Sequence, residues 1–364
     1  MSVASGVAIE RLSVSAYEVP ADQPESDGTL EWGSTTLVLV RADGGGESGL
    51  GFTYADVAAA RLVQSKLADV VEGCDPMSPQ SVWAAMQAAV RNLGAEGLAA
   101  MAISAVDVAL WDLKARLLGV SLADLLGRFH EQMAVYGSGG FTSYSNERLA
   151  AQLEGWAERG FARVKMKVGR NPGADPARLR AARAAIGDLV ELMVDANGAY
   201  TRKQALGWAE RFAEYGVTWF EEPVSSDDVE GLLLLRDRAP ASMDIAAGEY
   251  GWTLFDLERL SGAVDVLQAD VTRCGGITGM VRVDALCRAR SLPFSAHCAP
   301  AISAHVCCAM ESCEHIEYFH DHVRIESLLF DGVPDPVDGA LRPDPSRPGL
   351  GLELREADAK EYAL

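Results

Sequence analysis

Three successive β-type runs of the chain each end in a carboxylate side chain. These are Asp195, Glu221 and Glu249, spaced 26 and then 28 residues apart. Oxygen ligands without nitrogen or sulfur suit a hard divalent cation that keeps positions open for water and substrate, which favours Mg²⁺ over Zn²⁺, with Mn²⁺ as a substitute. A single acidic residue at a strand end is often a helix cap or part of a surface ion pair, but three in successive repeats predict a metal site. Of Glu221 and Glu222, we expect the first to be the ligand, because side chains alternate along a strand.

Two lysines end an earlier β-type run. Lys165 and Lys167 are two residues apart, so on a strand they point the same way. A lysine with its usual pKa of about 10.4 is a poor base. A neighbouring ammonium and a nearby Mg²⁺ both disfavour a second positive charge, so we expect Lys167 to shift toward the neutral form that a general base needs. The alternative interpretation is a pair of solvated surface lysines.

Two later runs lead to Asp270 and His297, and the last run closes on Glu317. Adjacent strands could place Asp270 beside the His297 imidazole, where a hydrogen bond to one ring nitrogen makes the other a better base. If buried among other carboxylates, Glu317 would tend to be protonated and to donate a hydrogen bond to substrate. The remaining five histidines are expected to be structural.

These residues fall at the ends of a repeated pattern that predicts an α/β protein with a TIM-type (β/α)7–8 barrel. From residue 134 onward, short apolar β-type runs alternate with helical patterns. The predicted strands are residues 134–136, 163–168, 189–194, 217–220, 243–246, 264–268, 293–296 and 315–318. Residues just after the carboxyl ends of barrel strands face one shared active site, so the polar residues above should meet there.

The residues outside this repeat are expected to form two further parts. Residues 1–130 contain strand-like segments followed by a helix-rich stretch and predict an α+β capping domain. Within it, turn-rich segments near residues 19–32 and 43–54 are expected to be loops over the active site that set substrate specificity. The catalytic barrel is assigned to residues 131–324, and the Pro- and Gly-punctuated segment 325–364 is expected to pack back on the capping domain.

The composition argues against several classes of partner. The 364 residues carry a formal net charge of −20, whereas nucleic acids and anionic membranes attract basic surfaces. No apolar run approaches the roughly 18 residues of a membrane span, and the N-terminus lacks the pattern of a secretory signal. Seven cysteines without CxxC spacing fit a reducing compartment better than a disulfide framework. We therefore expect a cytoplasmic protein without nucleic-acid or membrane partners.

Taken together, the motifs resemble the mandelate racemase group of the enolase superfamily. The resemblance rests on Lys165-x-Lys167, Asp195-x-Asn197, Glu221-Glu222-Pro223, Gly248-Glu249, Asp270 and His297, and in the first domain on Ala109-Leu110-Trp111-Asp112-Leu113. The related muconate-lactonising group would be expected to carry a lysine base on the sixth strand, whereas residues 270–273 contain no lysine. This departure favours the group with an Asp–His pair.

The resemblance implies a role for each selected residue, and a homo-oligomer as the family-level expectation. Asp195, Glu221 and Glu249 would bind Mg²⁺, and Lys167 and His297 would be bases on opposite faces of a small carboxylate substrate. Lys165 would assist the substrate carboxylate, and Asn197 would contact a hydroxyl. Asp270 would orient His297, and Glu317 would stabilise the enolate. We add Tyr54, at the end of the second turn-rich segment, as a substrate-binding residue.

The predicted reaction begins with removal of the proton α to a carboxylate. We favour dehydration of a sugar acid to a 2-keto-3-deoxy acid, in carbohydrate catabolism, because residues 19–32 are rich in side chains that bind hydroxyl groups. Racemisation or epimerisation of a 2-hydroxy acid, as in mandelate racemase, stays open, because the same two bases would serve it. Less favoured alternatives are a Schiff-base aldolase using Lys165 or Lys167 and a non-catalytic sugar-acid binding protein. A nicotinamide enzyme is disfavoured because residues 137–140 lack the full dinucleotide fingerprint.

Overall fold

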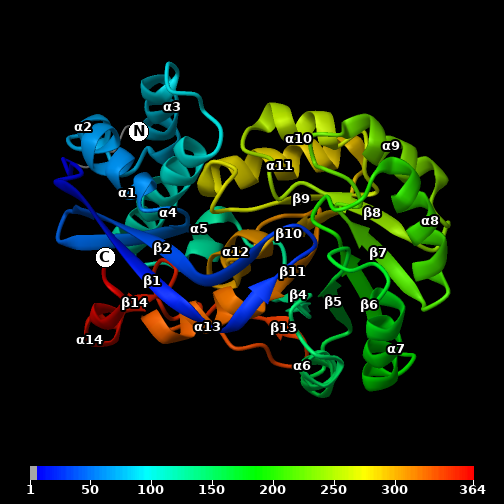
Figure 1. Ribbon diagram of the computed structural model, residues 1–364. Coiled ribbons are helices and arrows are strands. Elements are labelled where there is room, and N and C mark those ends of the chain that lie inside the picture. Colours follow the sequence, from blue (N-terminus) through cyan, green and yellow to red (C-terminus); the bar gives the residue numbers. More distant parts are fainter. Residues whose placement is uncertain (1–5) are drawn as a thin grey trace.

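Parallel strands form a closed barrel in the computed structural model, which describes residues 6–364 (Figure 1). In chain order the eight barrel strands are β4 (Met133–Gly139), β5 (Arg163–Lys167), β6 (Glu191–Asp195), β7 (Val217–Glu221), β8 (Asp244–Ala247), β9 (Val266–Ala269), β10 (Phe294–Ala296) and β11 (Cys313–Phe319). Each strand pairs with the next, and β11 pairs with β4 to close the ring. The predicted barrel is confirmed, and each predicted run overlaps one strand.

The barrel strands are buried on both faces, which explains why their sequences are apolar at most positions. Alternate residues form a separate apolar cluster inside the barrel, made of Tyr136, Met193, Trp219, Ala246 and Val266. The residues between them, such as Val164, Val194 and Phe220, belong to the large core shared with the surrounding helices. A packed interior leaves room for polar side chains mainly at the strand ends.

Helices connect the strands and surround the barrel. They are α6 (Asn146–Glu158), α7 (Asp175–Ile186), α8 (Arg202–Ala213), α9 (Val229–Arg238), α10 (Leu254–Leu260), α11 (Gly276–Arg290), α12 (Pro300–Cys308) and α13 (His320–Leu329). Capping boxes open α8 and α10, where Thr201 pairs with Gln204 and Thr253 with Asp256. These caps satisfy free backbone N–H groups and fix where each helix begins. None of the helices in the described part of the chain combines the length and the apolar character needed to cross a membrane.

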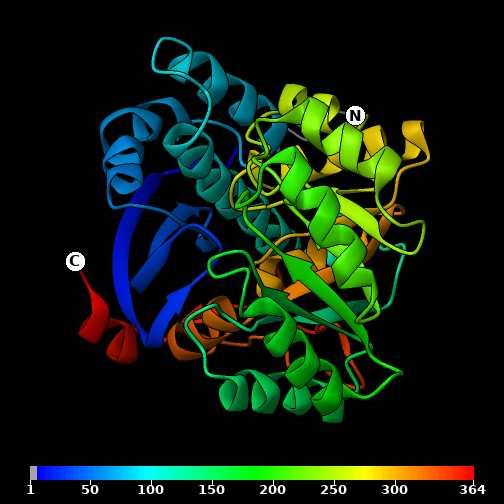
Figure 2. The ribbon, with the colours of Figure 1, turned by 45° about the vertical axis from the view of Figure 1, so that its right-hand side comes forward.

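Residues before the barrel form an antiparallel sheet with helices packed against it (Figure 2). The elements are β1 (Arg11–Ser26), β2 (Glu31–Gly44), β3 (Glu47–Tyr54), α1 (Ala58–Leu62), η1 (Val63–Leu67), α2 (Ala68–Val71), α3 (Pro79–Val90), α4 (Leu98–Leu118) and α5 (Leu122–Leu126). α4 packs on β3 and also contacts α11 of the barrel. There Trp111 Nε1 donates to Thr278 Oγ1 over 3.0 Å, and Asp107 Oδ2 accepts from the Thr278 N–H over 2.8 Å. These hydrogen bonds hold the sheet against the barrel.

The two segments predicted as loops, near residues 19–32 and 43–54, are mostly strand, and that expectation is wrong. Only residues 27–30 turn between β1 and β2, and only residues 45–46 turn between β2 and β3. The polar and proline-containing composition of the first segment is accommodated by a long hairpin with a register shift between Pro20 and Glu25. The turn of the first segment lies against the barrel, where a Cβ atom on Gly28 would come within 2.3 Å of the Ala196 carbonyl oxygen. The turn of the second segment lies at the opposite end of the sheet, where Asp43 pairs with Arg11.

Two glycines explain why the sequence pattern predicted a loop where the structure has strand β3. Gly49 and Gly51 weaken the β-pattern of the sequence, yet both lie within the strand and against α4. A Cβ atom on Gly49 would come within 2.2 Å of the Ala109 carbonyl oxygen, and one on Gly51 within 2.3 Å of the Ala105 carbonyl oxygen. Close approach of the helix backbone, and not a turn, requires glycine at these positions.

The chain after α13 returns to the N-terminal sheet. Its elements are β12 (Phe330–Asp331), β13 (Ala340–Leu341), β14 (Glu353–Leu354), α14 (Glu356–Ala359) and η2 (Lys360–Tyr362). The Leu350 N–H donates to Asp112 Oδ1 of α4 over 2.6 Å, and the Leu364 N–H donates to the Ala16 carbonyl of β1 over 3.0 Å. These hydrogen bonds tie the last residues of the chain to the sheet and helix that precede the barrel.

Replacing Gly51 with alanine should lower the free energy of unfolding by about 1–3 kcal/mol, because the new methyl group overlaps the backbone of α4. Gly33→Ala is the matched control, since an added Cβ there meets no atom within 4 Å. Its effect should stay within about 0.5 kcal/mol. Urea denaturation followed by circular dichroism measures both changes, and equal midpoints for the two variants would contradict the packing described for β3 and α4.

Candidate active site

The carboxyl ends of the barrel strands open into a cavity of about 470 Å³ that the β1–β2 hairpin borders. The barrel contributes Lys167, Asn197, Glu249, Tyr250, Arg273, His297, Cys298, Phe319 and His322 to its wall. The N-terminal part contributes Asp27, Leu30, Trp32, Ser34, Thr35, Thr36, Tyr54, Ala55 and Asp56. Both parts of the chain therefore form the cavity together.

Three buried carboxylates converge at the ends of β6, β7 and β8, and they are those that the sequence selected. One oxygen of each of Asp195, Glu221 and Glu249 lies within 4.8 Å of the others. Strand register brings them together, because Lys167, Asp195 and Glu221 are direct neighbours across β5, β6 and β7. Glu221 Oε1 is buried and has no hydrogen-bond partner among the described residues. An all-oxygen donor set with a spare buried oxygen fits Mg²⁺.

Glu222 stays close to these carboxylates, which strand alternation did not predict. β7 ends at Glu221, and the backbone of Glu222 turns into the left-handed region at φ 37°. Burial and the neighbouring carboxylates, Glu249 foremost, raise the pKa of Glu222 well above its usual range. Burial, opposed by Lys165, also raises the pKa of Glu221 to about 8. The carboxyl groups thus repel one another, and a cation among them would relieve this repulsion.

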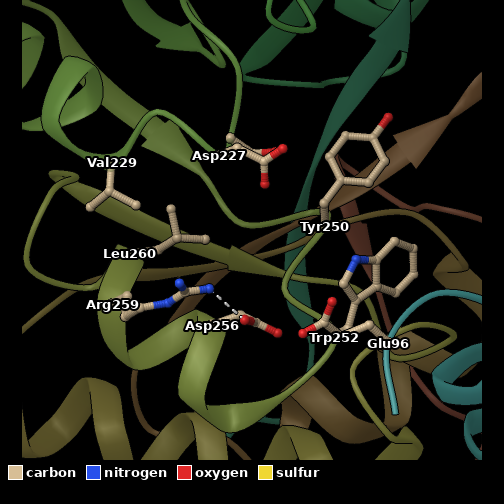
Figure 3. A pocket seen from close by; sticks show the side chains of 9 residues that line it. Glu96, Asp227, Val229, Tyr250, Trp252, Asp256, Arg259 and Leu260 are labelled. Carbon is tan, nitrogen blue, oxygen red and sulfur yellow. Dashed lines mark hydrogen bonds and ion pairs between the residues drawn. The ribbon is translucent and has the colours of Figure 1, made fainter. Parts of the chain in front are cut away.

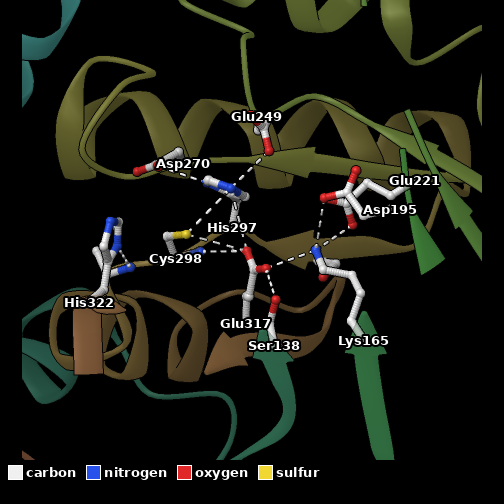
Figure 4. A network of polar contacts seen from close by, with 12 residues as sticks. Ser138, Lys165, Asp195, Glu221, Glu249, Asp270, His297, Cys298, Glu317 and His322 are labelled. Atoms are coloured by element: carbon white, nitrogen blue, oxygen red, sulfur yellow. Dashed lines mark hydrogen bonds and ion pairs between the residues drawn. The ribbon is translucent and has the colours of Figure 1, made fainter. Parts of the chain in front are cut away.

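Both lysines of β5 are paired with the carboxylates. Lys165 Nζ lies 2.7 Å from Glu221 Oε2 and 2.8 Å from Glu317 Oε1 (Figure 4). Lys167 Nζ lies 2.5 Å from Asp195 Oδ2. Burial opposes the charged form of Lys167, but Asp195 and the other nearby carboxylates outweigh it and raise its pKa above the usual range. Here the direct ion pair with Asp195 outweighs the neighbouring ammonium, so the expected shift of Lys167 toward the neutral form depends on the cation and stays a prediction.

Asp270 and His297 form the pair that the sequence predicted (Figure 4). His297 Nδ1 lies 2.8 Å from Asp270 Oδ2, and Asp270 Oδ1 accepts from the N–H and the hydroxyl of Thr272, each over 2.7 Å. The other ring nitrogen, Nε2, lies 3.0 Å from Glu249 Oε2. Burial opposes the charged imidazole, but Cys298, Glu249 and other acidic groups raise the pKa of His297 well above its usual range. The imidazolium is therefore the favoured form, which suits a proton donor.

Glu317 lies at the end of β11 between several donors. Ser138 Oγ donates to its Oε1 over 2.6 Å, and the Cys298 backbone N–H donates to its Oε2 over 3.2 Å. Although burial opposes the ionised form, Lys165 and His297 lower the pKa of Glu317 below its usual range. The expectation of a protonated Glu317 is wrong here, because the adjacent cations determine its charge more than the nearby carboxylates do.

Asn197 and Tyr54 both line the cavity, in different ways. Asn197 follows β6 in a left-handed conformation at φ 45°, and its Oδ1 has no hydrogen-bond partner among the described residues. The Tyr54 ring stacks on His322 with centroids 3.4 Å apart, and its hydroxyl lies 3.3 Å from Glu326 Oε1. His322, expected to be structural, thus reaches the cavity as well. The roles of Asn197 and Tyr54 in substrate binding stay predictions.

The cavity also contains residues that the sequence reasoning missed, among them Tyr250, Arg273 and Cys298. The Arg273 guanidinium lies 3.5 Å from Glu249 Oε1 and stands 5.2 Å above the centroid of the Tyr250 ring. Cys298 directly follows His297, and its Sγ lies 3.4 Å from His297 Nε2. Each of these residues lies one to three positions beyond a strand-end residue that was selected. That position was the signal available in the sequence.

A second cavity, of about 380 Å³, opens beside Tyr250 (Figure 3). Its wall includes Trp252, Asp256 and Arg259. Asp256 accepts from Thr253 in the capping box of α10 and pairs with Arg259 over 2.7 Å. These charged groups stabilise helix α10, and none of the predicted site residues lines this second cavity. We therefore place the chemistry in the cavity at the carboxyl ends of the barrel strands.

The chain matches known families over most of its length. Residues 16–127 match the family described as mandelate racemase / muconate lactonizing enzyme, N-terminal domain, and residues 148–358 match the enolase C-terminal domain-like family. The chain belongs to the mandelate racemase and muconate lactonizing enzyme family. The two matched ranges fall on the N-terminal sheet with its helices and on the barrel, and the resemblance read from the motifs is confirmed.

Two characterised relatives in this family carry names of sugar-acid enzymes. L-talarate/galactarate dehydratase of Salmonella typhimurium is 30% identical over 97% of this chain and 90% of its own. The 3,6-anhydro-alpha-L-galactonate cycloisomerase of Streptomyces coelicolor is 32% identical over 95% of this chain and 97% of its own. The relatives thus include both a lyase and an isomerase.

Solved structures of family members share the whole fold. A mandelate racemase/muconate lactonizing enzyme-like protein from Rubrobacter xylanophilus is 67% identical, with a TM-score of 0.97 over 98% of this chain and 99% of its own. L-talarate dehydratase from Polaromonas sp. JS666, complexed with Mg and L-glucarate, is 29% identical, with a TM-score of 0.88 over 98% of each chain. This family member therefore binds magnesium together with a small carboxylate ligand.

Glu221→Gln should weaken Mg²⁺ binding by at least about tenfold, because it removes a direct carboxylate ligand. Glu222→Gln should leave the affinity nearly unchanged, because Glu222 lies beyond the end of β7 and is not one of the three carboxylates that converge there. Isothermal titration calorimetry of the full-length variants with MgCl₂ near neutral pH gives both affinities. Equal losses in the two variants, or a loss in Glu222→Gln alone, would contradict the ligand assignment.

Proposed function

We propose that this protein is a Mg²⁺-dependent hydro-lyase that removes the proton α to a carboxylate and dehydrates a sugar acid to a 2-keto-3-deoxy acid. The observation that carries the proposal is that two proton-transfer groups contact different members of one carboxylate cluster. Lys167 contacts Asp195 at 2.5 Å, and His297 contacts Glu249 at 3.0 Å. A substrate carboxylate held at the cluster would have its α carbon between a lysine and an imidazole, which is the arrangement that proton transfer requires.

Positive charge at the cluster would favour formation of an enediolate. Asp195, Glu221 and Glu249 would hold Mg²⁺, which would supply charge to the substrate carboxylate and make the α proton more acidic. Lys165 adds a cation to the same region, since its fully buried ammonium lies between Glu221 and Glu317. Groups fixed before the reaction stabilise charge that develops in the transition state most effectively.

Lys167 would take the α proton at Nζ. Its pair with Asp195 keeps this nitrogen protonated, so Lys167 becomes a base only when the charge of Asp195 is engaged elsewhere. Coordination of a cation by Asp195 would have this effect. The same carboxylate would then link cation binding to the strength of the base.

His297 would give its proton to the departing β-hydroxyl. The imidazolium is held by Asp270, whose own carboxylate is fixed by Thr272, so the ring keeps one orientation. An oxygen leaves more easily when it is protonated as it departs. The two groups therefore have separate tasks, with Lys167 at carbon 2 and His297 at the hydroxyl of carbon 3.

The wall of the cavity supports a polyhydroxy substrate. Of the polar residues in segment 22–29, only Asp27 lines the cavity, but Ser34, Thr35 and Thr36 add hydroxyl groups from β2. Similarity to L-talarate/galactarate dehydratase also supports dehydration. A racemase or epimerase of a 2-hydroxy acid is the second candidate. It is favoured by the aromatic side chain of Trp32 in the wall, and it would use the same two bases.

We extend this proposal to the parts of the chain, the oligomeric state and the cellular compartment. We propose that residues 1–130 act as a cap whose hairpins select the substrate, that residues 131–324 are the catalytic barrel, and that residues 325–364 secure the cap. We also propose that the enzyme acts in the cytoplasm as a homo-oligomer. All seven cysteines of the sequence lie in the described residues and are free thiols, which supports a reducing compartment.

The first test of this function is the product. In D₂O with Mg²⁺, screening mono- and diacid sugars should identify a substrate that yields a carbonyl detected by semicarbazide, with deuterium at carbon 3 after ketonisation. Dehydration predicts both signals, because the enol product takes a solvent deuteron. Deuterium at carbon 2 with inverted configuration, in the absence of a carbonyl product, would show that the reaction is racemisation and not dehydration.

Lys167→Ala and His297→Asn should each reduce kcat on that substrate by about 10²–10⁴-fold, as loss of a general acid or base does. Both variants should keep the native circular dichroism spectrum. Lys203→Ala, which changes an exposed lysine on α8, is the control and should keep native turnover. Near-native turnover in Lys167→Ala would show that Lys167 is not the base that takes the α proton.

A further inference from the structure

Three unlike ligand atoms meet at the Asp270–His297 pair, and one of them, His297 Nε2, also lies 3.0 Å from Glu249 Oε2 of the carboxylate cluster. The distances are 3.4 Å from Cys298 Sγ to His297 Nε2, 3.4 Å from Cys298 Sγ to Glu317 Oε2, and 3.5 Å from His297 Nε2 to Glu317 Oε2 (Figure 4). All three side chains are buried. The proposed reaction uses His297 and places Glu317 beside Lys165, but it does not use Cys298, so it does not explain why the three atoms form a nearly equilateral triangle.

The size of the triangle matches one face of a tetrahedral zinc site. With Zn–S of about 2.3 Å and Zn–N and Zn–O of about 2.0–2.2 Å, tetrahedral angles place the ligand atoms about 3.3–3.7 Å apart. The three observed distances are 3.4, 3.4 and 3.5 Å. The donor set of sulfur, nitrogen and oxygen also distinguishes this triangle from the all-oxygen cluster, because a thiolate and an imidazole select zinc over magnesium.

Each corner of the triangle is fixed by a neighbouring group. Asp270 binds His297 Nδ1 and leaves Nε2, which lies 3.0 Å from Glu249 Oε2, as the ring nitrogen available to a metal, an arrangement common for zinc-binding histidines. Ser138 holds the other oxygen of Glu317 over 2.6 Å. The backbone of Cys298 is left-handed at φ 52°, and its N–H donates to Glu317 Oε2 over 3.2 Å. The contact of Nε2 with Glu249 is the one that a metal ion would replace.

We propose that His297, Cys298 and Glu317 form a binding site for Zn²⁺ and similar thiophilic divalent cations, distinct from the Mg²⁺ site, and that its occupation inhibits the enzyme. On binding, the metal replaces the thiol proton of Cys298 and the proton on His297 Nε2, and both protons pass to solvent. The inhibitory part rests on the proposed function, in which His297 gives a proton from that nitrogen. Magnesium would then activate the enzyme and zinc would inhibit it at neighbouring sites.

Cobalt(II) tests the site without any need for activity. Full-length protein saturated with Mg²⁺ should bind one equivalent of Co²⁺ and develop a thiolate-to-cobalt charge-transfer band. Cys298→Ser should lose this band, and Cys74→Ser, which changes a cysteine of the N-terminal part, should keep it. Absence of the band in the unaltered protein, or its persistence in Cys298→Ser, would overturn the proposal.

A second measurement on the unaltered protein covers the case in which Cys298→Ser does not fold. Zn²⁺ should slow maleimide labelling of Cys298, followed by peptide mass spectrometry, and should leave labelling of Cys74 unchanged. Equal labelling of Cys298 with and without Zn²⁺ would contradict the site.

Inhibition then connects this site with the proposed function. With Mg²⁺ present, Cys298→Ser should need about 100-fold more Zn²⁺ than Cys74→Ser for half inhibition, at the upper end of the loss caused by removing a supporting group of a metal site. Equal zinc sensitivity of the two variants would show that the inhibition does not arise from zinc bound at this triangle. Failure to find any dehydration would leave the cobalt band unaffected, so the two proposals fail independently.

Discussion

The crowding of buried carboxyl groups at one end of the barrel is the constraint on which the rest of the site depends. Asp195, Glu221, Glu222, Glu249, Asp270 and Glu317 are all buried there. Charges removed from water persist only when they are paired, hydrogen-bonded or bound to a metal. Lys165, Lys167 and His297 neutralise part of this charge, and burial together with the remaining repulsion raises the pKa of both Glu221 and Glu222. A divalent cation is the partner that this excess of acid requires.

The fold produces the crowding through strand register. Lys167, Asp195 and Glu221 lie side by side across three strands, and Ala296 pairs with Ala269 so that the next residues, His297 and Asp270, also meet. Since parallel strands carry these residues to the same end of the barrel, the hairpin of β1 and β2 needs only to border that end to complete a cavity. The last residues of the chain and α4 hold this N-terminal part against the barrel.

Sequence was sufficient wherever one residue's position in a repeat determined its location. The eight strands, the three carboxylates and the Asp270–His297 pair follow from such positions, because strand ends converge whatever the details of packing. Sequence was insufficient where contacts between residues distant in the chain determine the charge or the packing of a side chain. The charge of Lys167 depends on a direct pair with Asp195, and that of Glu317 on Lys165, neither of which spacing reveals. Gly51 resembled a loop residue because helix α4, distant in sequence, occupies the space of its side chain.

The central claim is that Lys167 and His297 act on one substrate in separate steps, and hydrogen exchange in the His297→Asn variant tests it most directly. With Mg²⁺ and the identified substrate in D₂O, this variant should exchange the α proton for deuterium with retained configuration and should form almost no keto product. Lys167→Ala should show neither exchange nor product. Exchange that survives in Lys167→Ala and disappears in His297→Asn would contradict the account, because it would make His297 the base at carbon 2.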